Sequence, residues 1–227
     1  MLIDQTVTCG DSRKLVKGVE PESVSLIFVD PVYQDHWQYQ WAAAIGNIVL
    51  RPEGNLLAWY GGNRDHVVQA LMEKSMQKVW TLHYTVPAKT TGNMGAFKLR
   101  CWTSFLFWFR KSRAGLPNKT ILDTYISASR PSGRFKWQKN YGVLAYYLCS
   151  FTKEGDLVLD PFAGEGSVGV VCKTYRRNYI GFEIDPKRAE TAQERINTTQ
   201  VMSILVEPTQ PELSFGKGQY VQQDGQE

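Results

Sequence analysis

Short apolar runs rich in β-branched and aromatic residues recur along the chain and predict strands. They lie at residues 5–9, 24–29, 55–60, 79–86, 103–109, 157–159 and 179–183. Segments with helical hydrophobic periodicity separate several of these runs. Alternation of this kind predicts an α/β fold with a mixed, mainly parallel sheet of about seven strands and helices on both faces. Ligands of such sheets bind at the carboxyl ends of the strands.

Two of the helical segments have recognisable starts. One follows Asn63, a good capping residue, and keeps an apolar face as far as Met76. The other starts at Asp185 with Pro186 in its first turn. Its inner face is expected to consist of three apolar residues, Ala189, Ala192 and Ile196.

The organisation along the chain indicates a single domain over residues 1–204. Hydrophobic residues make up 43% of the 227 residues, enough to form a core. Residues 205–227 are polar and rich in Pro, Gly and Gln, and are expected to form a disordered tail. No run approaches the roughly 18 apolar residues of a membrane span, and the first residues do not resemble a signal peptide. The expected location is the cytoplasm, without a membrane partner.

Cysteine and histidine residues give no sign of a metal site. The four cysteines are far apart, and the three histidines share no ligand spacing with them or with one another. The cysteines are therefore interpreted as reduced thiols, most of them buried, and no metal is expected.

The positive charge is concentrated in one segment. Residues 86–139 contain eleven basic residues and one acid, a net charge of +10, so the rest of the chain carries −6. Residues 101–109 form an apolar run typical of a central strand, but residues 110–139 have few apolar side chains to pack. The pattern favours contact of residues 110–139 with a nucleic acid, with a solvated basic face as the alternative. The basic residues assigned to this contact are Arg110, Lys111, Arg113, Lys119, Arg130, Arg134 and Lys136.

A glycine-rich turn follows the apolar run at 157–159. It contains G-x-G-x-x-G, and Glu183 lies 19 residues after Gly164, where an acid can bind a ribose. A nicotinamide site is one reading, but such folds usually open with this turn, and Asp160 puts a carboxylate where a pyrophosphate would lie. An ammonium group for Asp160, a carboxylate for the helix start at Ser167 and a ribose for Glu183 fit S-adenosylmethionine instead.

A second segment ends the buried run at 24–29 with Asp30, Pro31 and Tyr33. An exocyclic base amine is a poor nucleophile because its lone pair is delocalised, so a methylating site must accept its N–H hydrogens. The Asp30 carboxylate and the Pro31 carbonyl can do so, and Tyr33 can stack on a flipped base. The structural alternative is a turn that ends a strand.

Together these motifs resemble the DNA amino-methyltransferases that modify adenine N6 or cytosine N4, in the permuted order with the catalytic motif first. The resemblance covers about residues 5–197. It includes a Gly-Asp at 10–11, Asp-Pro-Val-Tyr at 30–33, Gln-Lys at 138–139, Asp-Pro-Phe-Ala-Gly-Glu-Gly-Ser at 160–167 and the strand end at 181–185. It implies a Rossmann-like methyltransferase fold and S-adenosylmethionine as the cofactor.

The resemblance also implies roles for individual residues. The catalytic residues are Asp30, Pro31 and Tyr33. The cofactor-binding residues are Asp11, Lys139, Asp160, Phe162, Ala163, Gly164, Glu165, Gly166, Ser167 and Glu183. Val32 replaces the second proline of the family's catalytic motif, and Phe135-Lys136 replaces the His-Pro that precedes its Gln-Lys.

The expected function is methylation of DNA at an exocyclic base amine. Adenine N6 is favoured because the catalytic motif starts with an acid instead of serine. Cytosine N4, an RNA or protein-amide acceptor, and a catalytically weak nucleic-acid-binding homologue remain alternatives. No nuclease motif stands out, so the chain is interpreted as a modification enzyme of the restriction–modification type without a cutting activity of its own, and whether it has a restriction partner stays open. DNA is the expected partner, and a homodimer remains open. The resemblance implies that the basic insertion at about 110–139 contacts the DNA.

Overall fold

The computed structural model describes residues 5–31, 36–62, 64–85, 92–94, 99–101, 103–126, 140–202 and 208–209, the side chains of 92–94 and 99–101 excepted. Several sequence predictions concern residues outside this set. They are the cap Asn63, the catalytic Tyr33 with its neighbour Val32, the cofactor residue Lys139, the basic residues Arg130, Arg134 and Lys136, and nearly all of the tail at 205–227.

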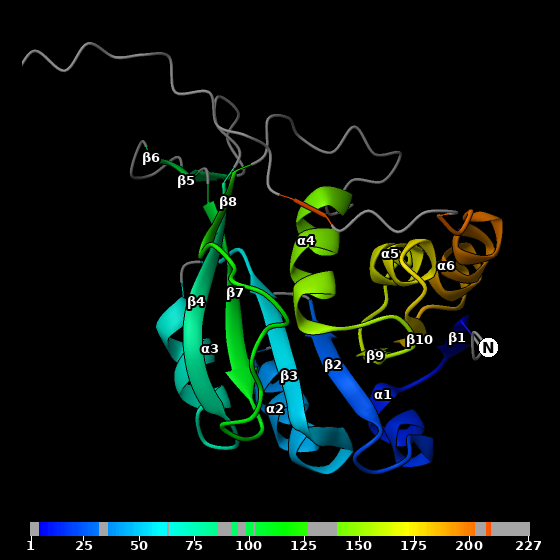
Figure 1. Cartoon of the computed structure of the whole chain (residues 1–227), viewed down its shortest axis with the longest axis horizontal. Coiled ribbons are helices and arrows are strands. Elements are labelled where there is room, and N and C mark those ends of the chain that lie inside the picture. Colours follow the sequence, from blue (N-terminus) through cyan, green and yellow to red (C-terminus); the bar gives the residue numbers. More distant parts are fainter. Residues whose placement is uncertain are drawn as a thin grey trace, which may run out of the picture.

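An eight-stranded sheet forms the centre of the molecule (Figure 1). Its order is β1-β10-β9-β2-β3-β7-β4-β8. The strands are β1 (Gln5–Cys9), β2 (Val24–Val29), β3 (Leu50–Tyr60), β4 (Gln77–Thr85), β7 (Thr103–Arg110), β8 (Thr124–Ile126), β9 (Leu157–Asp160) and β10 (Asn178–Glu183). A separate pair is formed by β5 (Gly92–Met94) and β6 (Leu99–Cys101).

The strand directions confirm the prediction of a mixed, mainly parallel sheet. Strand β7 runs antiparallel to both of its neighbours, β3 and β4, and the other pairs are parallel. The sheet exceeds the expected seven strands because β8 has only three residues, too few for a visible hydrophobic pattern. All strands except β7 therefore end at one edge of the sheet.

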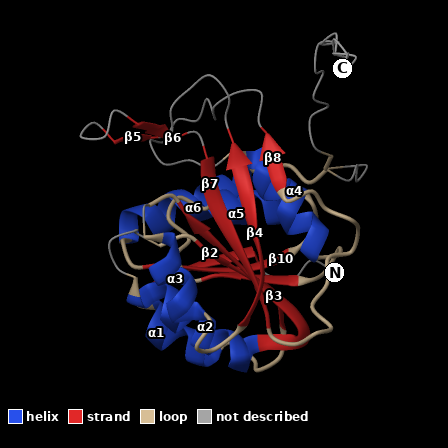
Figure 2. Ribbon diagram, turned by 90° about the vertical axis from the view of Figure 1, so that its left-hand side faces the viewer, coloured by secondary structure: helices blue, strands red, loops and turns tan. Residues whose placement is uncertain are grey.

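Helices cover both faces of the sheet, as expected (Figure 2). One layer consists of α1 (Ser12–Leu15) with the 3-10 turn Val16–Gly18, α2 (Trp37–Val49) and α3 (Asp65–Met72). The other consists of α4 (Tyr141–Phe151), α5 (Ser167–Thr174) and α6 (Pro186–Thr198). None of the described helices is long and apolar enough to cross a membrane.

The boundaries of two predicted helices can be checked. Helix α6 is capped by Asp185, with Ala189, Ala192 and Ile196 buried, as expected. Helix α3 ends at Met72, four residues before the predicted end, so that prediction was wrong. The chain turns there, but Met76 is still buried against the same core, which explains the misleading apolar pattern. The thiols Cys149 and Cys172 are buried, whereas Cys9 is exposed.

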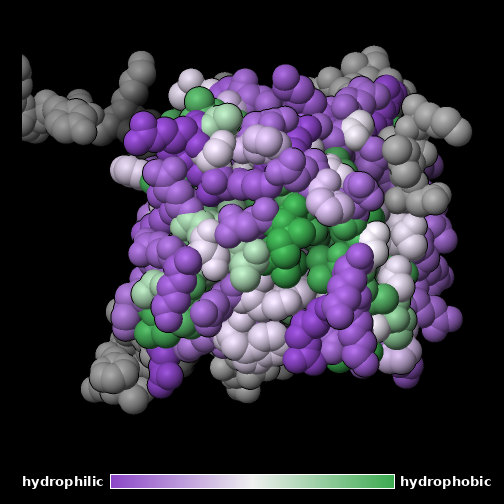
Figure 3. Space-filling view, turned by 90° about the horizontal axis from the view of Figure 1, so that it is seen from below, coloured by the Kyte–Doolittle hydropathy of each residue, from purple (hydrophilic) through white to green (hydrophobic). Residues whose placement is uncertain are grey.

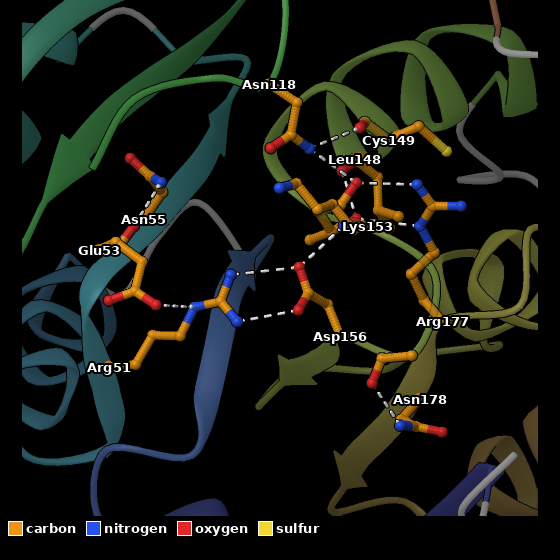
Figure 4. A network of polar contacts seen from close by, with 12 residues as sticks. Arg51, Glu53, Asn55, Asn118, Leu148, Cys149, Lys153, Asp156, Arg177 and Asn178 are labelled. Carbon is orange, nitrogen blue, oxygen red and sulfur yellow. Dashed lines mark hydrogen bonds and ion pairs between the residues drawn. The ribbon is translucent and has the colours of Figure 1, made fainter. Parts of the chain in front are cut away.

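A polar network ties together the amino ends of the strands, opposite the edge where most of them end (Figure 4). The Arg51 guanidinium donates to both oxygens of Asp156, at 2.9 and 3.2 Å, and so joins the start of β3 to the turn before β9. Arg177, which is 3% exposed, donates to the carbonyl oxygen of Thr152 at 2.8 Å. Since these charges are satisfied within the fold, we interpret this network as structural.

Candidate active site

Four neighbouring parallel strands carry the predicted acids to one edge of the sheet. Asp160 and Glu183 are the last residues of β9 and β10, while Asp30 directly follows β2 and Asp11 lies two residues after β1. The chain order reverses between β9 and β2, which are adjacent in the sheet. The structure therefore brings together, at a topological switch point, motifs that are more than 100 residues apart in the sequence.

Asp30, the predicted catalytic acid, lies beside the predicted cofactor motif. Ile27 pairs with Leu159, so the alternation of side chains places Asp30 on the same sheet face as Asp160. The negative charge of Asp30 contributes to the raised pKa values of Asp160 and of the Tyr39 hydroxyl, although burial is the larger cause in both. Asp30 is half-buried and Pro31 is buried. Two hydrogen-bond acceptors, the Asp30 carboxylate and the Pro31 carbonyl, therefore follow β2, the strand adjacent to β9.

Asp160 is a buried acid with neutral partners. It is 2% exposed, its Oδ1 accepts from the Phe162 amide at 3.1 Å, and its Oδ2 accepts from the Tyr179 hydroxyl at 3.3 Å. Burial raises its pKa to about 8, with smaller contributions from the charges of Asp30 and Glu183. Among the described residues no cation pairs with it. A buried acid in this setting favours a cationic ligand.

The turn after β9 depends on two glycines with left-handed backbone. Gly164 has φ +53° and Gly166 has φ +77°. A Cβ atom on Gly166 would lie 2.9 Å from the Cβ of Ala192 in α6, whereas one on Gly164 would meet nothing within 4 Å. Gly166 therefore permits close packing of the turn on α6, and Gly164 leaves open space at the strand ends.

The turn is further held by hydrogen bonds to neighbouring elements. The Ala163 amide donates to the Phe182 carbonyl of β10 at 2.9 Å, and the Gly166 amide donates back to the Ala163 carbonyl at 2.8 Å. Arg195 of α6 donates to the Glu165 carbonyl and to the Tyr141 hydroxyl of α4. The first-turn amides of α5, which starts at Ser167, have no partners within the helix and can receive a carboxylate.

Glu183 organises the turn as well as presenting a carboxylate. It is 8% exposed. Its Oε2 accepts from the Gly164 amide at 2.8 Å and its Oε1 accepts from the Asp185 amide at 3.0 Å. Each carboxylate oxygen has a second lone pair, so Glu183 can also accept from a ribose hydroxyl.

We expect Glu183→Ala to weaken S-adenosylmethionine binding by about 1.5–3 kcal/mol, since hydrogen bonds to a charged acceptor are lost. The change also removes the partners of two amides, so the melting temperature without cofactor should fall as well. Calorimetric titration and thermal melts measure the two effects separately. Glu190→Ala, on an exposed position of α6, is the control. Unchanged cofactor affinity in Glu183→Ala would remove Glu183 from the site.

Asp11 lies next to these groups after β1. It caps α1 by accepting from the Arg13 amide at 2.9 Å, and its carboxylate pairs with the Arg13 guanidinium, which lowers the pKa of Asp11 to about 2. The Gly10 amide donates to the Glu183 carbonyl at 2.8 Å. The Ser12 hydroxyl donates to the Pro161 carbonyl at 2.5 Å. Asp11 is thus fixed at the same edge as the β9 and β10 motifs.

The donor and acceptor set fits S-adenosylmethionine. Asp160 can receive the ammonium group, the start of α5 the carboxylate and Glu183 the ribose, while Phe162 is half-buried beside the turn. Sequence reasoning missed Ile184, an aliphatic side chain that is 73% exposed directly after Glu183. Its exposure suits an apolar contact with the cofactor adenine, and the position following the ribose acid is the signal that could have identified it.

The described basic residues do not join this edge. Strand β7 is antiparallel, and its last residue, Arg110, pairs with Gln77, the first residue of β4, which places Arg110, Lys111 and Arg113 at the opposite edge. Lys111 donates to Glu22 and to the Leu50 carbonyl, both at 2.7 Å. That side, seen in Figure 3, carries hydrophobic residues among hydrophilic ones instead of a continuous hydrophilic surface.

Lys119 has partners different from those of the other three basic residues. Its ammonium donates to the Pro208 carbonyl at 3.2 Å and lies 5.6 Å from the ring centre of Tyr146. Arg110 donates to Gln77, so Arg110, Lys111 and Lys119 have side-chain partners within the chain, whereas Arg113 is exposed. The structure does not gather these four residues at the candidate site.

Known proteins resemble both the sequence and the fold. The Type II methyltransferase M2.LlaDCHI of Lactococcus lactis subsp. cremoris is 23% identical over 237 residues, covering 82% of this chain and 87% of that protein. The structure of M1.HpyAVI in complex with SAM has a TM-score of 0.72 at 20% identity, covering 85% of this chain and 98% of that one. PvuII DNA methyltransferase, described as cytosine-N4-specific, also has a TM-score of 0.72, at 18% identity, covering 88% of each chain.

The family comparison is decisive for membership. The model of the DNA methylase family of N6 and N4 methyltransferases (N6_N4_Mtase) matches residues 73–194, more than half of the chain. This segment includes the buried Asp160, the glycine turn and Glu183. The chain therefore belongs to the N6/N4 DNA methylase family, whose members use S-adenosylmethionine as the methyl donor.

Proposed function

We propose that this DNA amino-methyltransferase transfers a methyl group to adenine N6 of a flipped base in DNA. The observation that carries the proposal is the position of Asp30. It follows β2 on the sheet face that also carries Asp160, one strand away, at the switch point of the sheet. A base amine held by Asp30 would lie next to the cofactor's methionine end.

The role of Asp30 and Pro31 is to hold the amine. S-adenosylmethionine supplies an electrophilic methyl group on a sulfonium centre. The Asp30 carboxylate and the Pro31 carbonyl accept the two N–H hydrogens of the base amine, which favours a nitrogen lone pair directed out of the ring plane. The new N–C bond would form as the C–S bond breaks, with S-adenosylhomocysteine as the neutral leaving group. Asp30 would stabilise the positive charge on nitrogen until the extra N–H proton leaves to solvent. Tyr33, outside the described residues, is proposed to stack on the flipped base.

The acidic residue at the start of the catalytic motif supports adenine over cytosine. Expression in a host without DNA methylation, followed by mass spectrometry of the digested DNA, is expected to detect N6-methyladenine. Methylome sequencing of the same DNA would give the recognition sequence. Detection of N4-methylcytosine alone would contradict the choice of base while supporting the chemistry, and methylated RNA without methylated DNA would contradict the DNA substrate.

For DNA contact we propose Arg130, Arg134 and Lys136, since Arg110, Lys111 and Arg113 lie at the edge opposite the candidate site. Replacing Arg130 and Arg134 with Ala should weaken DNA binding and make the plot of log K against log salt shallower by about 0.9 per lost phosphate contact. The measurement is fluorescence anisotropy with a DNA duplex at several salt concentrations. Arg110→Ala with Arg113→Ala is the matched control, which removes the same charge at the opposite edge and should keep the wild-type slope. A shallower slope in the control alone would place the DNA at that edge.

A further inference from the structure

The Tyr179 hydroxyl is a buried partner of Asp160 that has no role in the function proposed above. Tyr179 lies in β10, is fully buried, and donates to Oδ2 of Asp160 at 3.3 Å. The other carboxyl oxygen, Oδ1, accepts from the Phe162 amide at 3.1 Å. Each oxygen of Asp160 therefore has one donor, and the two donors belong to different segments, β10 and the turn after β9.

Two glycines leave the space that the Tyr179 ring occupies. Tyr179 and Gly181 are two residues apart on β10 and share a face of the sheet, and Gly181 pairs with Asp160 in the neighbouring strand. A Cβ atom on Gly181 would overlap the Tyr179 hydroxyl and lie 2.8 Å from two carbons of its ring. One on Gly169 of α5, the last glycine of the G-x-G-x-x-G pattern, would lie 2.7 Å from Cε1 of the same ring. The absence of side chains at both positions thus allows the hydroxyl to reach Asp160.

The hydrogen bond from Tyr179 opposes the effect of burial on Asp160. Burial raises the pKa of Asp160 to about 8, whereas the hydrogen bonds from the Phe162 amide and the Tyr179 hydroxyl act to lower it. A hydrogen bond to a carboxylate is charge-assisted and stronger than one to a neutral acid. Tyr179 therefore reduces the cost of ionising Asp160, which has to occur before an ammonium group can pair with it.

The other titratable groups around Asp160 act in the opposite direction. The charges of Asp30, after β2, and of Glu183, at the end of β10, contribute to its raised pKa. The Cys172 thiol of α5 is close enough for the charge of Asp160 to contribute to the raised pKa of Cys172, although burial is the larger cause there. All three groups are acids, so none of them favours the Asp160 carboxylate. Among the described side chains around Asp160, the Tyr179 hydroxyl is the one that favours its ionised form.

We propose that Tyr179 is a positioning residue of the cofactor site, whose hydroxyl holds the Asp160 carboxylate oriented and ionised for the ammonium group of S-adenosylmethionine. When the cofactor binds, Asp160 loses its proton to solvent, and the hydrogen bond from Tyr179 stabilises the buried charge together with the ammonium group. This inference rests on the proposed function, because it requires that Asp160 receives the cofactor, but it does not depend on which base is methylated.

The first test is Tyr179→Phe, which keeps the ring in its place and removes only the hydroxyl. The dissociation constant of S-adenosylhomocysteine at pH 7 should rise on the order of tenfold, since a hydrogen bond to the ionised acid is lost. At pH 9 the difference from wild type should shrink to about twofold, because Asp160 then ionises to a large extent in both proteins. The titration of the ligand itself cancels in the ratio of the two constants.

Calorimetric titrations from pH 6.5 to 9 measure this ratio. A purely structural role of Tyr179 would weaken binding by the same factor at every pH, and that result would overturn the proposal. Wild-type affinity of Tyr179→Phe across the whole range would also overturn it.

Two controls separate this effect from the loss of any buried hydroxyl. Tyr147→Phe on α4 removes a hydroxyl from an equally buried ring that contacts backbone carbonyls near β4 and β8, and it should keep the wild-type affinity at every pH. The second control is the ligand 5′-methylthioadenosine, which lacks the amino-acid end of the cofactor. Its affinity should be the same in wild type and in Tyr179→Phe. Weaker binding of this ligand to Tyr179→Phe would show a disturbed adenosine site and would contradict the proposal.

Two further variants test whether Tyr179 acts through Asp160. Gly181→Ala displaces the hydroxyl, so it should show the same pH-dependent loss of affinity as Tyr179→Phe. In Asp160→Asn, which cannot ionise, the addition of Tyr179→Phe should cause no further loss. Additive losses in this double variant would refute an action through Asp160. Thermal melts show which variants are folded, and Tyr179→Phe decides the outcome if Gly181→Ala is not.

Failure of this inference differs from failure of the proposed function. If wild type methylates DNA and Asp30→Asn does not, while Tyr179→Phe binds S-adenosylhomocysteine as wild type does at every pH, only the role of Tyr179 is refuted. If the expected pH-dependent difference is found but wild type methylates no nucleic acid, the role of Tyr179 is supported and the proposed function is refuted.

Discussion

Asp30→Asn should abolish methyl transfer while leaving cofactor binding nearly intact. The change is almost isosteric, and it replaces one carboxylate oxygen with an NH2 group that cannot accept a hydrogen bond. The negative charge that stabilises the developing ammonium on the target base is lost as well. By comparison with the removal of single groups that stabilise charge in other transition states, we expect kcat to fall on the order of 1,000-fold.

The cofactor should still bind because its proposed anchors are on other strands. Asp160 and Glu183 end β9 and β10, whereas Asp30 follows β2. The measurements are kcat from a radiolabelled methyl-transfer assay and the dissociation constant of S-adenosylhomocysteine from calorimetry. Asp65→Asn, the same change at the start of α3, is the control and should retain activity. Turnover within tenfold of wild type in Asp30→Asn would contradict the catalytic assignment.

The strands that form the site could be predicted well because they are buried on both faces. The apolar runs at 24–29 and 157–159 match β2 and β9 to within one residue, and β10 starts only one residue before its predicted start. In contrast, β3 starts five residues early at Leu50 and includes the polar residues Arg51 and Glu53. Arg51, near the start of β3, is stabilised by its ion pair with Asp156. No local sequence pattern shows such a tertiary contact.

The acids of the site were predictable for a different reason. Asp160 and Glu183 end a strand, Asp30 directly follows one and Asp11 lies two residues after one, and parallel strands bring their carboxyl ends to one edge. The sequence did not show in which direction each strand runs in the sheet. The basic residues after residue 109 follow an apolar run just as Asp30 does, but β7 is antiparallel and carries them to the opposite edge. The position of Arg110 and Arg113 in the sequence therefore did not indicate how far they lie in space from the catalytic motif.

The guanidinium of Arg13 lies 5.3 Å from the ring centre of Trp37, a contact that was not predicted because neither residue belongs to a sequence pattern. Arg13 lies in a four-residue helix, and Trp37 is a single aromatic residue at a helix start. Their relation arises only when β1 and β2 are placed in the sheet with β9 and β10 between them. A signal was present in the spacing of Trp37 and Trp41, one helical turn apart directly after the catalytic motif.

Asp160→Asn should stabilise the cofactor-free protein while severely weakening S-adenosylmethionine binding. The pKa of Asp160 is raised from 3.8 to about 8, mainly by burial, so the folded state favours the protonated acid. This group therefore contributes full stability below about pH 4, and the contribution is lost as the pH rises toward 8. Asparagine does not titrate, so at pH 7 the variant should gain up to about 4 kcal/mol in the free energy of unfolding.

The pH dependence gives the sharper comparison. The contribution of Asp160 to the free energy of unfolding should fall between about pH 4 and 8 in the wild type. Asp160→Asn should lack that part of the decline. Thermal melts of both proteins across this range measure the difference. Asp156→Asn is the matched control, since Asp156 precedes the same strand, β9, but pairs with Arg51 at 2.9 Å. Losing that ion pair should lower stability without changing cofactor affinity.

Cofactor binding should show the opposite trend in pH. An ammonium group requires ionised Asp160, so binding must release the proton that Asp160 holds at neutral pH. Between pH 6 and 7.5, below the usual α-amino pKa of about 7.7–8.0, the wild-type affinity should rise with pH by up to roughly tenfold per unit. Calorimetry in buffers of different ionisation enthalpy would count the released proton. In Asp160→Asn both the proton release and the slope should disappear. Proton release that persists in this variant would show that another group, and not Asp160, receives the ammonium.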